Sequence, residues 1–134
     1  MTLELEELVA AAPEVVWAAL ADDRQRAAWW SYLELDPYPG GALLERWTDG
    51  DGRRHATRGA VVEADAPRRL RATWRDDGWP AETEVTIGLT EERGGTWIRV
   101  THSGWDKLPD GDALLATHRD GWRAHLARWA THVA

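Results

Sequence analysis

The sequence contains no cysteine, no phenylalanine and no asparagine, and Lys107 is its only lysine. The absence of cysteine excludes disulfides, thiol nucleophiles, thiolate metal sites and thiol redox chemistry. The chain also lacks the run of about 18 apolar residues that a membrane-spanning helix needs. The fold must therefore be stabilised by side-chain packing alone.

Positive charge is outnumbered, with 16 Lys and Arg against 23 Asp and Glu. The formal net charge is -7, so phosphate backbones and anionic lipid surfaces are repelled rather than attracted. The first residues include Glu4, Glu6 and Glu7 where a signal peptide would carry Lys or Arg. We therefore expect no nucleic-acid partner, no membrane partner and a cytoplasmic location.

The chain has 134 residues, 43% of them hydrophobic, which suffices for one sizeable core. No internal repeat and no linker long enough to divide domains is present, so we expect a single domain over residues 1–134. Ten tryptophans in a chain without phenylalanine are the unusual feature of this composition. These indoles require an explanation.

The N-terminal third alternates between strand and helix patterns. Residues 2–10 place leucines among glutamates with a period of two, which predicts a half-buried strand. Pro13 suits the first position of a short helix over residues 13–21. Asp22 or Asp23 is expected to cap a second short helix that runs towards Trp29 and Trp30, and the Pro/Gly-rich residues 36–41 predict a loop.

From residue 42 onward, four or five strands are separated by short turn signals, which predicts an antiparallel meander. Leu70, Ala72 and Trp74 share one face of a strand, and in the strand over 96–104 His102 lies on the buried side. A long amphipathic helix is predicted from Asp112, its expected cap, to about residue 132. The fold class is therefore α+β: a curved antiparallel sheet of about six or seven strands around a C-terminal helix.

Several segments, in this order and spacing, resemble the START-like or SRPBCC superfamily (the helix-grip, Bet v-type fold). More narrowly, they are similar to homologues of the heat shock protein 90 ATPase activator. The resemblance implies a cavity between sheet and last helix that holds apolar or aromatic small molecules, and it implies no particular reaction. The matching pieces are Ala12-Pro-Glu-Val-Val-Trp17 with Leu20, Trp29-Trp30, Gly59 with Val61, Pro67 with Leu70 and Trp74, Thr101-His-Ser-Gly104, and His118 with Gly121-Trp122, Leu126 and Trp129.

Large rings that cannot close-pack around a curved sheet leave a concave apolar space suited to small ligands. We therefore expect a pocket for an apolar or aromatic ligand, oriented by His102 and His118. Protonation of such inward histidines below about pH 6 should weaken ligand binding. The alternative is that the same rings simply fill the core. The expected walls are Trp29, Trp30, Trp74, Trp122 and Trp129.

Catalytic and metal sites are weakly indicated. Successive histidines at 118, 125 and 132 are on the order of 10 Å apart along a helix, too far to share one metal ion. Ser103 adjoins His102, but neighbours on a strand project to opposite faces. Strand glutamates, including Glu45, are expected on a solvated face. We assign no catalytic residue, no metal and no cofactor.

Three functions remain open. The first is a small-molecule binding or carrier protein, monomeric or homodimeric. The second is an enzyme of the cyclase, dehydratase or hydrolase type that uses the same cavity. Its mark would be an inward carboxylate or histidine with a shifted pKa at the cavity wall. The third is a co-chaperone-like protein that binds a partner through an apolar patch.

Overall fold

The computed structural model describes all of residues 1–134. It contains a seven-stranded antiparallel sheet, two short helices, a single 3-10 turn and one long C-terminal helix. The elements are, in chain order, β1 (Thr2–Val9), α1 (Pro13–Ala21), α2 (Asp23–Trp29), β2 (Leu33–Leu35), β3 (Ala42–Thr48), β4 (Arg54–Asp65), β5 (Arg69–Asp76), β6 (Thr83–Glu92), β7 (Gly95–Ser103), η1 (Trp105–Lys107) and α3 (Gly111–Val133).

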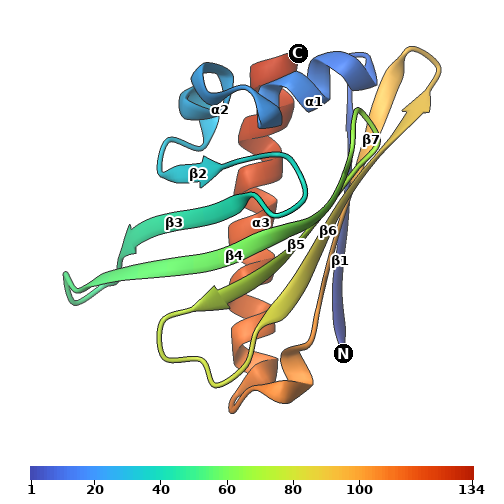
Figure 1. The fold of residues 1–134 in the computed structure, drawn as a ribbon. Coiled ribbons are helices and arrows are strands. Elements are labelled where there is room, and N and C mark those ends of the chain that lie inside the picture. Colours follow the sequence, from blue (N-terminus) through green and yellow to red (C-terminus); the bar gives the residue numbers. More distant parts are fainter.

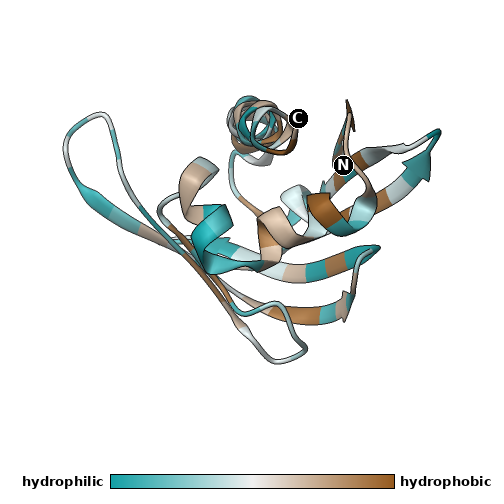
Figure 2. Ribbon diagram, turned by 90° about the horizontal axis from the view of Figure 1, so that it is seen from above, coloured by the Kyte–Doolittle hydropathy of each residue, from teal (hydrophilic) through white to brown (hydrophobic).

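The sheet has the strand order β1-β7-β6-β5-β4-β3-β2, and every neighbouring pair is antiparallel. Helix α3 runs along one face of this sheet, while α1 and α2 close the end near the C-terminus (Figure 1). Viewed from above, almost along the axis of α3, the sheet bends beneath the helix (Figure 2). The predicted α+β helix-grip architecture is therefore confirmed.

Two features of β4 bend the sheet. The register of β4 against β5 shifts between Val61 and Glu63, and such a bulge increases local twist. At Gly59 an added Cβ would collide with the main-chain oxygen of Thr73, so only glycine permits this close approach of the two strands. The bend directs the strands β3, β4 and β5 around α3, where the candidate site lies.

The core forms between the concave face and the helices. Alternate residues of each strand point inward, as predicted for Leu70, Ala72 and Trp74 in β5 and for His102 in β7. In α3 the buried residues Leu115, Trp122, Leu126 and Trp129 recur at helical spacing. One cluster of 25 buried hydrophobic residues results.

Three local predictions can now be assessed. Helix α1 has the predicted bounds, and the Asp22 side chain caps α2 by accepting a hydrogen bond from the Gln25 amide at 2.9 Å. The predicted cap of the last helix is wrong. Asp110, in a left-handed conformation, occupies the cap position instead of Asp112 and makes no side-chain cap bond. The three-residue strand β2 was also missed, because it is too short to show a period.

Candidate functional site: a pocket between the sheet and helix α3

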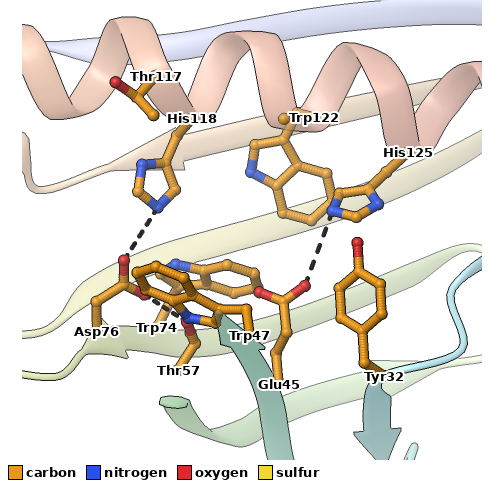
Figure 3. A pocket seen from close by; sticks show the side chains of 11 residues that line it. Tyr32, Glu45, Trp47, Thr57, Trp74, Asp76, Thr117, His118, Trp122 and His125 are labelled. Carbon is orange, nitrogen blue, oxygen red and sulfur yellow. Dashed lines mark hydrogen bonds and ion pairs between the residues drawn. The ribbon is translucent and has the colours of Figure 1, made fainter. Parts of the chain in front are cut away.

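A pocket of about 270 Å³ opens between α3 and the concave side of β3, β4 and β5 (Figure 3). The sheet contributes one wall and a single face of α3 contributes the other. Exposed residues at the pocket, including Tyr32 and Gly121, connect it with solvent. Its lining consists of Tyr32, Glu45, Trp47, Thr57, Trp74, Asp76, Thr117, His118, Gly121, Trp122 and His125.

Three indoles form the aromatic part of the pocket. Trp74 from β5 and Trp122 from α3 are buried, and their ring centroids lie 5.6 Å apart in a tilted arrangement. Trp47 from β3 is half-buried and donates its indole N–H to the Thr57 hydroxyl at 3.0 Å. The Trp74 Nε1 is the one buried side-chain polar atom in the molecule without a hydrogen-bond partner. The pocket therefore offers flat apolar surface, and the N–H of one of its indoles is buried without a partner.

Glu45 is the most unusual group in this lining. Only 7% of the residue is exposed, and its Oε2 accepts a hydrogen bond from the Trp30 indole at 2.8 Å. Burial raises the pKa of Glu45 to about 7, although the Trp30 hydrogen bond acts in the opposite direction. The nearby negative charge of Asp76 raises this pKa further. Glu45 therefore exchanges its proton near neutral pH.

His125 on α3 faces Glu45. Its ring stacks on Trp30 at a centroid distance of 3.8 Å, and Arg128 donates to its Nδ1 at 2.7 Å. Because Arg128 can only donate, the proton of the neutral ring is on Nε2, which lies 3.9 Å from the Glu45 Oε2. Burial, assisted by the charge of Arg128, lowers the pKa of His125 to about 3. His125 is therefore neutral at physiological pH.

A second carboxylate–imidazole pair lies at the other end of the pocket. The His118 Nε2 is 3.6 Å from the Asp76 Oδ2, and the other Asp76 oxygen accepts from the Thr57 hydroxyl at 2.5 Å. Burial raises the pKa of Asp76, against the lowering effects of the Thr57 hydrogen bond and of a charge on His118. Figure 3 shows the two pairs on either side of the indoles, each joining the sheet to α3.

His102, predicted to contact the ligand, lies behind this lining. It is fully buried, and its Nδ1 accepts from the Trp122 indole at 3.2 Å. The proton is therefore on Nε2, which donates to the Thr83 hydroxyl at 2.7 Å, and Thr83 donates in turn to the Trp74 carbonyl. Burial lowers the pKa of His102 to about 2, with a smaller contribution from His118. His102 holds Trp122 and Trp74 in place as a neutral ring.

The other predicted residues divide between pocket and core. Trp74, His118 and Trp122 line the pocket, and Trp30 lies directly behind Glu45 and His125. Trp29 and Trp129 lie outside the lining and stack on each other with a centroid distance of 5.0 Å. Both indole N–H groups donate to carbonyls of α1, those of Ala19 and Val16. Close packing thus accounts for this pair.

Sequence reasoning missed the carboxylates. The expectation of a solvated strand face is wrong for Glu45, which is buried, and Asp76, the last residue of β5, was not among the predicted site residues. A signal for Glu45 does exist. It alternates in phase with Leu43, and residues two apart on a strand share a face. The charge of Glu45 favours the solvated face in a reading of the sequence alone.

The charged and imidazole groups form two separate pairs rather than one ligand set. No group of three or more His, Asp or Glu side chains is positioned to hold a metal ion. None of the helices combines the length and apolarity required to cross a lipid bilayer. The chemistry that the pocket offers is hydrogen bonding, proton exchange and contact with aromatic faces.

A bent antiparallel sheet that encloses a long terminal helix, with a pocket between the two, defines a helix-grip domain of the START-like, SRPBCC class. The chain belongs to the family described as Activator of Hsp90 ATPase homolog 1-like protein, whose model matches residues 10–134. A comparison with curated proteins gave no match.

Solved structures share this fold. CalU16 from Micromonospora echinospora is 22% identical with a TM-score of 0.80, and the match covers 99% of this chain and 76% of that one. DynU16, from the dynemicin biosynthetic locus, is 23% identical with a TM-score of 0.81 over 98% of this chain and 46% of that one. CV1439 from Chromobacterium violaceum is 26% identical with a TM-score of 0.80, covering 98% and 96%. The first two likenesses concern the fold alone, and the chain spans about half the length of DynU16.

Proposed function

We propose that this protein binds a small molecule with an aromatic or apolar body in the pocket between the sheet and α3. The observation that carries the proposal is the composition of the lining, in which the indoles of Trp74 and Trp122 lie beside a few convergent polar groups. Ligand sites typically combine a mainly apolar concave surface with a small number of precisely placed polar groups. The pocket of about 270 Å³ is near the lower end of the usual range of roughly 300–1,000 Å³, which favours a ligand of one or two rings.

Gly121 provides a direct test. It lies on the pocket side of α3, and a Cβ added there has no neighbouring atom within 4 Å. Gly121→Leu should therefore fill the pocket without disturbing the helix. Ala124→Leu is the matched control, because it adds the same side chain to an exposed position on the same helix outside the pocket.

The measurement is isothermal titration calorimetry with naphthol, indole and phenethyl alcohol. Binding is expected in the wild type and in Ala124→Leu, with a loss of roughly tenfold or more in Gly121→Leu. Equal affinity in all three proteins would show that binding occurs elsewhere. Failure of every probe, at concentrations up to solubility, would contradict the proposal.

An acid–base enzyme is a second candidate, favoured by the buried Glu45. A carboxyl group with a pKa near the working pH is suited to donate and accept protons, and Asp76 with His118 forms a separate basic pair across the pocket. Such a site could promote proton transfer next to a carbonyl group, as in cyclisation or dehydration. Deuterium exchange into the methyl group of acetophenone, followed by NMR, tests this activity. Exchange above the buffer rate that disappears in Glu45→Gln would support the enzyme, and exchange equal to buffer would oppose it.

A further inference from the structure

Apart from its histidines, the charged side chains of the pocket have one sign. Glu45 and Asp76 both line it, whereas no lysine or arginine does. Arg128, the nearest cation that affects Glu45, contacts the Trp29 carbonyl and the Nδ1 of His125, on the side of the His125 ring away from Glu45. An anionic ligand would thus meet two carboxyl groups without a counter-charge. The protein as a whole, with a formal charge of -7, also attracts cations.

At the end of the pocket formed by Asp76 and His118, two hydrogen-bond acceptors face each other. The His118 Nδ1 is 2.9 Å from the Leu114 carbonyl, so the ring donates its proton there, and its Nε2 in the neutral form is an acceptor. This acceptor faces the Asp76 Oδ2 across 3.6 Å, which is longer than a hydrogen bond. At the other end, Glu45 already accepts a hydrogen bond from the Trp30 indole and faces the N–H of His125. With His118 in this neutral form, a ligand donor placed between Asp76 and His118 would satisfy both acceptors.

The walls next to these acceptors are aromatic. The Trp74 ring centroid lies 6.2 Å from that of His118 in an edge-on arrangement, and Trp122 and Trp47 complete the surface. The negative π face of an indole attracts a cation, with the strongest effect where water is excluded. Trp74 and Trp122 are both buried. The aromatic surface and the two carboxyl groups thus favour the same kind of ligand.

Resting on the proposed function, we infer that the ligand is an organic amine bound as its ammonium ion. Its N–H groups donate to the Asp76 Oδ2 and the His118 Nε2, and its apolar body lies against Trp74 and Trp122. Glu45 is not a direct partner; its negative charge strengthens binding when its proton is lost. The amine supplies a donor to the Asp76 Oδ2, whereas Thr57 donates only to the other oxygen of this carboxyl group.

Binding of a cation should depend on pH through Glu45. Ionised Glu45 adds a second negative charge, so affinity for a cation should rise between pH 6 and pH 8 by roughly fivefold. His125 remains neutral over this range. The charged or titratable groups facing the two carboxyls are Tyr32 before β2, His55 on β4, Asp77 after β5, and His118, His125 and Arg128 on α3.

Three probes of similar shape separate the alternatives: phenethylammonium as the cation, phenethyl alcohol as the neutral analogue and hydrocinnamate as the anion. We expect phenethylammonium to bind roughly tenfold more tightly than the alcohol and hydrocinnamate to bind most weakly. Asp76→Asn retains an oxygen for Thr57 but removes the charge, and it should reduce affinity for the cation roughly tenfold or more, with little change for the alcohol. Circular dichroism shows whether the variant is folded.

Glu45→Gln is the second variant, and it retains an oxygen acceptor for Trp30. It should abolish the increase in cation affinity between pH 6 and pH 8 and keep the affinity found for wild type at pH 6. If the alcohol or hydrocinnamate binds as tightly as the cation in a Gly121-dependent manner, the inference is overturned while the proposed function stands. If no probe binds, or if Gly121→Leu changes the affinity for none of them, both the inference and the proposed function are overturned.

Discussion

The Trp30 indole donates a hydrogen bond of 2.8 Å to the Glu45 carboxylate, although burial of that carboxylate raises its pKa to about 7. One hydrogen bond to the charged form is thus too weak to offset the loss of hydration. Trp30 holds Glu45 in a fixed position at the pocket, and burial places its titration at neutral pH. Glu45 thus combines a fixed geometry with a charge that changes near neutral pH.

The stability of the protein should depend on Glu45 in a defined pH window. A raised carboxyl pKa means that the folded state holds the proton more tightly than the unfolded state, whose pKa is 4.5. The stabilisation is therefore fully present below pH 4.5 and is lost as the pH rises towards 7. Glu45→Gln does not ionise and should gain about 2 kcal/mol relative to wild type between pH 5 and pH 8.

Urea denaturation of both proteins at pH 5 and pH 8 measures this difference. The comparison with Glu45→Gln is essential, because the lowered pKa values of His102 and His125 change stability in the opposite direction below pH 6.5. The difference between the unfolding free energies of the two proteins removes the contribution of the two histidines. A difference in stability that does not change with pH would indicate that Glu45 titrates as an ordinary exposed carboxyl.

His102 and His125 should remain uncharged throughout the pH range of the native protein. Their pKa values are lowered to about 2 and about 3, so the expected loss of ligand binding below pH 6 does not arise from protonation of these rings. Nitrogen-edited NMR should show both rings with the proton on Nε2 and without titration between pH 8 and pH 5. A midpoint near 6.5 for either ring would contradict the burial and hydrogen bonds described above.

The Trp29–Trp129 pair should contribute to stability rather than to binding. Trp129→Ala removes a buried ring and is expected to cost about 3–5 kcal/mol in the free energy of unfolding. Trp97→Ala, at an exposed position of β7, is the control and should cost less than about 1 kcal/mol. Chemical denaturation provides both values. Similar values for the two variants would show that the stacked pair is not part of the packed core.

Gly121 should make α3 less stable than an alanine at this position would, while it leaves the pocket open. It lies in the interior of a 23-residue helix with space for a Cβ, so Gly121→Ala is expected to stabilise the protein by about 0.5–1 kcal/mol. The reciprocal change Ala124→Gly should destabilise it by a similar amount. Thermal denaturation of the two variants tests this prediction. A destabilising Gly121→Ala would mean that the glycine has a conformational role not visible in the helix.

Much of the fold could be predicted from the sequence, because periodic patterns determine which faces are buried. Strand alternation identified His102 and Trp74 as inward, and helical spacing placed Trp122 and Trp129 on the buried face of α3. The pocket was less predictable. Trp29, Trp74 and Trp129 are all buried, but only Trp74 lines the pocket, because Trp29 and Trp129 stack on each other and bond to α1.

The polar part of the site was harder to predict for a different reason. A charged side chain in a strand is normally solvated, so Glu45 was assigned to the surface. Its burial depends on Trp30, fifteen residues earlier, and on His125 of α3, and these contacts arise only in the tertiary structure. The pairing of Asp76 with His118 is equally non-local.

The most direct test of the account is the titration of the Glu45 carboxyl group by carbon-13 NMR, with and without phenethylammonium. The midpoint should lie near pH 7 in the unliganded protein and move to lower pH when the cation binds, because a nearby positive charge favours the ionised form. A midpoint near 4.5 that is unaffected by the cation would contradict both the buried, ionisable Glu45 and the binding of an amine beside it.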